Sequence, residues 1–299
     1  MAGNQRPAPF TQITQRDLTT AVKTTQGRFD LRLVICGLGS IGIDVAHAVL
    51  QDKVPGVVLT GVIEPTVSPN REQIAATGLP VYDELADLDW DSTDVVLEAA
   101  SQTALRSIAP RVLEQGVDLV ALSAGATLDS EFMAALVSSA HESGSRVWFP
   151  SGALGGLDAV RAANISAVHS IKLTTTKPPH AFTGAPYVIE KQINLAGLKK
   201  SQELFSGDAA TAVRGFPQNV NVAALLVLAT EDPDRVRVTI VADPNASDNI
   251  HEVEVSGTFG NMYIQLQNKP NATNPKTSAL ASQSVIALLR QLGAPLRFA

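Results

Sequence analysis

The stretch that most limits the possible fold is GLGSIG at residues 37–42, which fits the pattern G-x-G-x-x-G. The apolar run LRLVIC precedes it at 31–36, and IDVAHAVL follows at 43–50 with the apolar spacing of a helix. A strand, a glycine turn and a helix in that order are typical of a dinucleotide-binding unit. We therefore predict that this turn binds the pyrophosphate of a dinucleotide.

Each residue of the turn has its own expected task. Gly37 permits the tight turn, Gly39 lets a pyrophosphate approach the backbone because it has no Cβ, and Gly42 lets the helix pack on the strand. Ser40 and Ile41 lie at the helix N-terminus, where free N–H groups and the positive end of the helix dipole attract phosphate. The alternative is a glycine turn with a structural use only.

An acidic residue, Glu64, ends the second apolar run, VVLTGVIE at 57–64. A carboxylate at this place accepts hydrogen bonds from the adenosine ribose, and it repels the 2′-phosphate of NADP. We therefore expect NAD as the cofactor. NADP stays open, because Arg71 lies close enough along the chain to hold a 2′-phosphate, and Glu64 could instead be a solvated carboxylate at a strand end.

The order of apolar runs predicts an α/β protein with two domains. Residues 30–126 alternate strands with helices, which indicates a parallel sheet and a Rossmann dinucleotide-binding domain. Residues 127–270 contain runs that alternate with period two, which indicates an open mixed or antiparallel sheet with helices on one side. Residues 1–29 are polar and form an N-terminal extension, while 271–299 contain a capped amphipathic helix.

Composition narrows the possible partners. Hydrophobic residues make up 45% of the 299 residues and the formal net charge is −6, with no cluster of Lys and Arg, which argues against nucleic acid or an anionic membrane as a partner. The single cysteine, Cys36, excludes an internal disulfide and a cysteine zinc site, and no histidine or carboxylate pairs suggest another metal site. Neither a signal peptide nor a run long enough to span a bilayer is visible, so we expect a soluble cytoplasmic protein.

Six segments in order resemble the L-aspartate dehydrogenase family, and the likeness runs from about Leu31 to Leu292. The segments are VLEAAS (96–101), LSAGA (122–126), PSGALGGLDAVRAA (150–163), FPQNVNVAA (216–224), ADPNASDNIHEVEVSGTFG (242–260) and NPKTSALASQSVIALLR (274–290). The resemblance implies a Rossmann domain to which the closing helix at 271–299 returns, a second α/β domain for substrate binding, and a homodimer. The N-terminal extension is not usual in this family.

The resemblance also implies a reaction and residues for it. The reaction is the conversion of L-aspartate and NAD(P)⁺ to iminoaspartate, and then to oxaloacetate and ammonia. His251 occupies the place of the family's active-site histidine, and Ala126 and Asn221 occupy dinucleotide contact positions. Ala100 and Ser101 belong to a strand end beside the nicotinamide.

A histidine suits the proton transfer that such a reaction needs, because its unperturbed pKa of about 6.5 lets it accept and return a proton near neutral pH. His251 comes directly before EVEVS, which we expect to be a strand that holds the imidazole at the sheet end. The alternative is a polar residue at a strand entry. His180, in a loop after two prolines, is the other histidine suited to the role.

Further groups are candidates for holding the substrate carboxylates. They are Lys177, Lys276, Asn219 and the backbone N–H groups of Ser151, Gly152 and Ala153, at a bend before a helix. The alternatives are surface lysines, a bend that serves packing, and an asparagine cap on the buried helix VAALLVLA.

Two other functions stay open at this point. Relatives often have arginine where this chain has Thr176, so the substrate could be another small amino or hydroxy dicarboxylate. A non-catalytic sensor of NAD is the second alternative. His251 in an intact motif favours an enzyme, because a sensor needs no proton carrier.

Overall fold

The computed structural model describes residues 30–217, 221–272, 274 and 276–297. The N-terminal extension at 1–29 and Asn219 lie outside these residues. From Leu31 onward the chain packs as one unit, which holds two sheets.

The first sheet has six parallel strands in the spatial order β3-β2-β1-β4-β5-β6. Its strands are β1 (Leu31–Cys36), β2 (Val57–Ile63), β3 (Val81–Tyr82), β4 (Val95–Glu98), β5 (Asp118–Ala121) and β6 (Val147–Trp148). This order is that of the Rossmann fold, whose ligands bind where the strand order reverses, here between β1 and β4. The expected Rossmann domain is confirmed.

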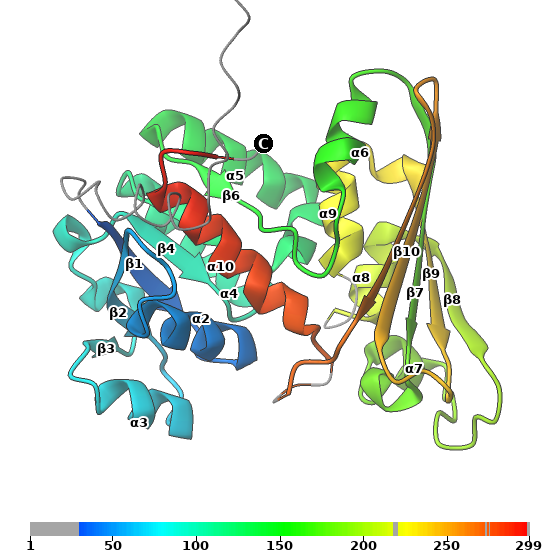
Figure 1. Cartoon of the computed structure of the whole chain (residues 1–299), viewed down its shortest axis with the longest axis horizontal. Helices are drawn as coiled ribbons and strands as arrows, with labels where there is room; N and C mark the ends of the chain where they lie inside the picture. Colours follow the sequence, from blue (N-terminus) through cyan, green and yellow to red (C-terminus); the bar gives the residue numbers. More distant parts are fainter. Residues whose placement is uncertain (1–29, 218–220, 273, 275, 298–299) are drawn as a thin grey trace, which may run out of the picture. The chain divides into compact units, whose positions relative to one another are not determined.

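Helices cover both faces of the first sheet. They are α2 (Ser40–Leu50), α3 (Pro69–Ala75), α4 (Gln102–Glu114) and α5 (Ser130–Ser143). The closing helix α10 (Ala279–Gly293) packs beside α2, as Figure 1 shows, and its Val285 and Leu289 share a buried cluster with Leu33 of β1. The C-terminal segment therefore returns to the first sheet, although Ser278 makes no side-chain cap on this helix.

One expected strand belongs to the other sheet. The sequence places the run containing Val147 and Trp148 in the second half, but β6 pairs in parallel with β5 of the first sheet. The indole Nε1 of Trp148 donates to Asp118 Oδ2 at 3.0 Å, which fixes this edge. The composition changes near residue 126 because helix α5 is mostly exposed, with Leu136 as its only buried residue. The change therefore does not mark the end of the first sheet.

The second sheet has five strands in the order β11-β10-β7-β9-β8, and only the pair β7 and β9 is parallel. Its strands are β7 (Val168–Lys177), β8 (Gln202–Asp208), β9 (Val236–Ala242), β10 (Asn249–Gly257) and β11 (Gly260–Asn268). The accompanying helices are α6 (Leu157–Asn164), α7 (Pro186–Glu190), α8 (Ala209–Gly215) and α9 (Asn221–Thr230). Figure 1 shows α6, α8 and α9 on one side of this sheet, which confirms the expected open mixed sheet.

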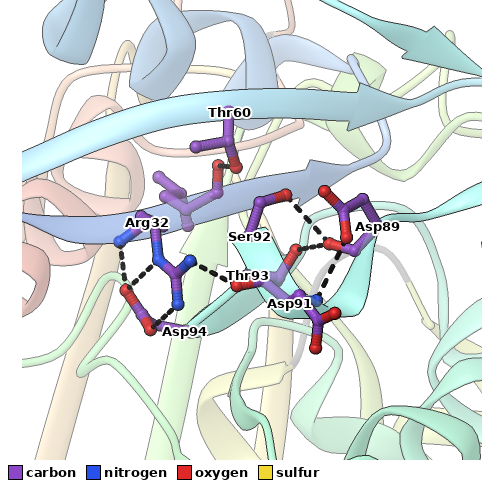
Figure 2. Close-up of polar contacts among 8 residues, drawn as sticks. Arg32, Thr60, Asp89, Asp91, Ser92, Thr93 and Asp94 are labelled. Carbon is purple, nitrogen blue, oxygen red and sulfur yellow. Dashed lines mark hydrogen bonds and ion pairs between the residues drawn. The ribbon is translucent and has the colours of Figure 1, made fainter.

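A polar network closes the end of the first sheet that is opposite to the strand C-termini (Figure 2). The Arg32 guanidinium on β1 donates to Asp94 through Nε at 3.0 Å and Nη2 at 2.7 Å, and it also contacts the carbonyl of Asp91. Arg32 lowers the pKa of the Asp94 carboxyl by hydrogen bonding. The network ties β1 to the turn before β4, so it sets the register of the two strands whose other ends approach the glycine turn.

Candidate active site

A cavity of about 170 Å³ lies between the strand ends of the first sheet and the buried face of the second. Eight residues expected from the sequence line it, and these are Ile41, Ala100, Gly152, Ala153, Lys177, Asn221, His251 and Lys276. Residues of α2, β7, α9 and β10, of the segment after β4 and of the approach to α10 therefore meet in one place. The fold brings together residues that lie more than 200 positions apart in the chain.

The glycine turn has the shape that a pyrophosphate needs. Gly37 has a φ of +96°, and a Cβ there would lie 2.8 Å from Ala100 Cβ, while a Cβ on Gly42 would lie 2.0 Å from the Gly37 carbonyl oxygen. A Cβ on Gly39 would meet its nearest atom only at 3.9 Å, so the backbone faces open space there. Helix α2 begins at Ser40 without a side-chain cap, which leaves its first N–H groups for a phosphate.

Glu64 follows β2 and reaches the glycine turn. Its Oε2 accepts from the Leu38 N–H at 2.8 Å, and its Oε1 accepts from the Thr66 N–H at 3.1 Å. The carboxylate is therefore held at the turn rather than solvated at a distance from it. The Arg71 guanidinium contacts the Glu64 carbonyl and pairs with Asp83 at 2.8 Å, so these interactions must be rearranged before Arg71 can hold a 2′-phosphate.

Some polar side chains of the second sheet lie on its buried face, because the side chains of a strand alternate between the two faces of the sheet. Two neighbouring rows face the helices, which are Ile171, Leu173, Thr175 and Lys177 on β7 and Val255, Val253, His251 and Asn249 on β10. Both rows change from aliphatic to polar at the same end, which is the end at the cavity. Thr176 alternates to the other face and does not line the cavity, so the replacement of the family's arginine at this position leaves the cavity wall intact.

His251 is the third residue of β10, inside the strand rather than before it. The strand begins earlier than EVEVS because Asn249 and Ile250 pair with Asn268 and Gln267 of β11. The imidazole is 1% exposed, and its Nδ1 lies 3.0 Å from Thr175 Oγ1. Burial, and then the positive charge of Lys177, lower the pKa of His251 to about 3, so the expectation of a group that titrates near neutrality is wrong for the free protein.

Lys177 is buried rather than at the surface, with 3% of its area exposed. Its Nζ donates to the carbonyl oxygen of Lys276 at 3.0 Å, and burial lowers the pKa of its ammonium to about 7. A buried ammonium at a cavity wall is stabilised by an anionic ligand. Lys276 contributes its carbonyl to this contact, and its side chain is partly buried at the same wall.

A buried carboxylate that the sequence interpretation passed over lies behind the cavity. Glu98, at the end of β4, is fully buried, and its oxygens accept from the Ser123 N–H at 3.0 Å, the Ser123 hydroxyl at 2.8 Å and the Ala100 N–H at 2.9 Å. Burial raises its pKa, against these hydrogen bonds. Glu98 joins the ends of β4 and β5, and an acid inside the apolar run VVLEAAS was the signal for it.

The bend at 150–153 serves packing more than it serves binding through free N–H groups. The Gly152 N–H donates to Ser284 Oγ of α10 at 3.0 Å, so it is not free for a carboxylate. Helix α6 begins only at Leu157, so the bend is not a helix N-terminus as expected. Gly152 and Ala153 line the cavity, while Ser151 is not among its lining residues.

Asn221 is the first residue of α9 and lines the cavity. Its Nδ2 is 3.5 Å from the Leu122 carbonyl, and its Oδ1 is buried without a hydrogen-bond partner among the described residues. Asn249 Oδ1 is in the same state, although Asn249 Nδ2 donates to Ser278 Oγ at 3.3 Å. A buried acceptor without a partner fits a site whose ligand brings a donor.

Ala126, Ser101 and His180 also lie outside the cavity wall. Ala126 is buried in a 3₁₀ turn, where its carbonyl accepts from Arg106, and Ser101 caps α4 by accepting from the Ala104 N–H at 3.1 Å. His180 is exposed on another 3₁₀ turn and does not line the cavity. Of the two histidines considered for proton transfer, the structure brings only His251 to the cavity.

Two features are absent from the described residues. No group of three or more His, Cys, Asp or Glu side chains is placed to hold a metal ion in that part of the chain. None of its helices combines the length and the apolar character needed to span a bilayer.

Comparisons with known proteins agree with this architecture. Residues 37–150 match the family described as homoserine dehydrogenase, NAD binding domain, and residues 158–292 match aspartate dehydrogenase, C-terminal. The L-aspartate dehydrogenase of Methanosarcina mazei is 38% identical over 269 residues, which are 89% of this chain and 98% of that protein. The chain belongs to the aspartate dehydrogenase family.

Other members agree with the assignment. The L-aspartate dehydrogenase of Bradyrhizobium diazoefficiens is 38% identical over 89% of this chain and 93% of its own length. The crystal structure of aspartate dehydrogenase from Thermotoga maritima has a TM-score of 0.69 and 26% identity, and it covers 90% of this chain and 99% of that one. As in the family, a nicotinamide dinucleotide is the cofactor of the first domain, and the glycine turn and Glu64 fit it.

Proposed function

We propose that the protein is an NAD-dependent L-aspartate dehydrogenase that oxidatively deaminates L-aspartate to iminoaspartate, which yields oxaloacetate and ammonia. The observation that carries the proposal is the pair of buried side chains His251 and Lys177, which line one cavity with the residues after β1 and β4. NAD⁺ supplies the hydride acceptor when it is bound. The chain's own residues must then hold the two carboxylates and remove a proton from the amino group.

Lys177 is the proposed partner of a substrate carboxylate. Burial disfavours its ammonium form and lowers its pKa to about 7. A carboxylate beside it stabilises the charged form, and two desolvated opposite charges attract strongly. Lys276, on the segment before α10, is the candidate for the second carboxylate. Asn221 Oδ1 offers an acceptor to the cofactor's amide or to the substrate's amino group.

His251 is the proposed acid and base. Its neutral imidazole takes a proton from the substrate ammonium, so the electron pair stays on nitrogen for the oxidation. Binding of a dianion near Lys177 offsets the positive charge that helps to depress the pKa of His251. The alternative of another dicarboxylate substrate loses its main support, because Thr176 lies outside the cavity wall. The cytoplasmic location stays a prediction.

We expect the unmutated protein to prefer NAD⁺ over NADP⁺, because the Glu64 carboxylate is held at the glycine turn and repels a 2′-phosphate. Glu64→Gln keeps the shape and removes the charge, so it should narrow the ratio of kcat/KM for the two cofactors. Glu72→Gln on the exposed side of α3 is the matched control and should leave the ratio unchanged. Equal or better kcat/KM with NADP⁺ in the unmutated protein would contradict the proposal.

We also propose that the protein is a homodimer that pairs through the outer face of the second sheet. This face carries the exposed side chains of Lys172, Glu254 and Tyr263, of which Tyr263 is 59% exposed. A solvent-exposed face of an open sheet is often covered by a second copy of the chain in a dimer. Tyr263→Asp should shift the mass measured by light scattering at micromolar concentration towards the monomer. Val137→Asp, at an exposed position on α5, is the control and should leave the measured mass unchanged. A monomeric mass for the unmutated protein would refute the proposal.

A further inference from the structure

Thr175 and His251 form a cross-strand pair on the buried face of the second sheet. They stand directly opposite each other in the register of β7 and β10, which places their side chains on the same face. Thr175 is fully buried, and its Oγ1 lies 3.0 Å from His251 Nδ1. Within the described part of the chain, the Thr175 side chain makes its hydrogen bond with this ring nitrogen. Thr175 is not itself a lining residue of the cavity.

The pair decides which ring nitrogen can meet a ligand. His251 lines the cavity, and its Nδ1 is taken by a residue inside the sheet. The nitrogen that is left for a ligand is therefore Nε2. The partner of one ring nitrogen fixes the ring's orientation and influences the protonation of the other nitrogen.

The Thr175 hydroxyl has two possible hydrogen-bonding roles towards Nδ1. Its hydroxyl can donate a hydrogen bond to an unprotonated Nδ1, and it can accept one from a protonated Nδ1. A carboxylate or a carbonyl can only accept, so it would favour a ring that keeps its proton on Nδ1. For Nε2 to accept a proton, Nδ1 must already carry the proton of the neutral ring, so the reaction needs the hydroxyl oxygen as the acceptor of a hydrogen bond from Nδ1–H in both the neutral and the protonated ring.

We propose that Thr175 is a positioning residue whose Oγ1 accepts a hydrogen bond from Nδ1–H of His251, which keeps the proton of the neutral ring on Nδ1 and leaves the lone pair of Nε2 to gain and lose the proton of the reaction. When the N–H bond of the substrate breaks, the electron pair stays on the amino nitrogen and the proton forms a bond with Nε2. Nδ1–H donates to Thr175 Oγ1 before and after this transfer, so only the protonation of Nε2 changes. The return of the proton reverses these steps. The inference rests on the proposed function, because it assigns a role within the same proton transfer.

The first test uses turnover with NAD⁺ and L-aspartate in the full-length protein. Thr175→Val keeps the side-chain shape but removes the hydroxyl, and it should lower kcat by about 10–100-fold, the usual effect of losing a residue that orients an active-site group. KM for NAD⁺ should stay unchanged, because Thr175 is buried in the second sheet and does not line the cavity. Thr175→Ser restores the hydroxyl and should recover most of the turnover.

The matched control is Thr174→Val, since Thr174 is the neighbour whose side chain alternates to the opposite face. Turnover of this variant should equal that of the unmutated protein. If the valine at 175 prevents folding, Thr175→Ala is the second variant without a hydroxyl, because its smaller side chain fits the same space. Thermal unfolding of each variant separates a loss of folded protein from a loss of kcat.

The second test reads the ring directly and uses no substrate. Nitrogen NMR of the histidine side chains, assigned to His251 by the signal lost in His251→Gln, should show a shifted Nδ1 resonance in the hydroxyl-free variants and an unshifted one in Thr174→Val. Unchanged kcat together with an unmoved Nδ1 resonance in the hydroxyl-free variants would overturn the inference. Absence of aspartate-dependent NAD⁺ reduction in the unmutated protein would count against the proposed function alone, because the NMR result does not depend on it.

Discussion

His251→Ala should lower turnover with L-aspartate by about 10²–10⁴-fold, the usual contribution of a positioned general acid or base. Binding of NAD⁺, measured by quenching of intrinsic fluorescence or by calorimetry, stays nearly unchanged, because the glycine turn and Glu64 belong to the first sheet. His180→Ala is the matched control. Its imidazole is exposed and outside the cavity, so its loss should leave turnover as it was.

Near-normal turnover in the His251→Ala variant would end the assignment of His251 as acid and base. A loss of NAD⁺ binding as large as the loss of turnover would also contradict it, since the effect would then be structural. In this variant, kcat/KM should still change with pH near neutrality, as we expect for the unmutated protein. The free protein's His251 has a pKa of about 3, so this pH dependence belongs to another group.

Lys177→Met should lower kcat/KM for L-aspartate by about 30- to 4000-fold, because removing one partner of a buried charge pair costs about 2–5 kcal/mol and each 1.4 kcal/mol corresponds to about tenfold. The kcat/KM of the unmutated protein should fall as pH rises through about 7, where Lys177 loses the proton it needs to hold a carboxylate. Lys177→Met should lack this limb. Lys191→Met, at an exposed position after α7, should retain both the activity and the limb.

The lowered pKa of Lys177 also predicts how the stability of the protein depends on pH. Its folded-state pKa is about 7 against an ordinary 10.5, so between these values the unfolded chain binds a proton that the folded chain does not. The free energy of unfolding therefore rises with pH across this window. Below pH 7 the buried charge destabilises the folded protein, and Lys177→Met should raise Tm there. A Tm that falls, together with an unchanged limb in kcat/KM, would contradict the assignment of Lys177.

Local patterns in the sequence predicted much of the fold. The glycine turn was recognisable because its own backbone imposes strict demands, namely the φ of +96° at Gly37 and the close approach of Gly42 to the Gly37 carbonyl oxygen. Glu64 was recognisable because its task follows from its place at the end of β2. Both depend on contacts within one βαβ unit, and such contacts leave a direct trace in spacing and residue type.

Features that depend on distant pairing were harder to predict. The role of Thr175 requires the register between β7 and β10, which joins residues 76 positions apart. Gly152 loses its free N–H to Ser284, 132 positions away. The edge strand β6 is two residues long, and its membership in the first sheet depends on pairing with β5 rather than on its own pattern. The burial of Lys177 likewise follows from the packing of the two sheets.

The most direct test of the proposed function is the reduction of NAD⁺ by the unmutated protein with a panel of small acids, followed through the absorbance of reduced nicotinamide. The panel contains L-aspartate, other L-amino acids and the hydroxy analogue of aspartate, and ammonia is measured in the same samples. The account predicts reduction with L-aspartate and an equal amount of ammonia. Reduction with the hydroxy acid but not with L-aspartate, or with no member of the panel, would contradict it.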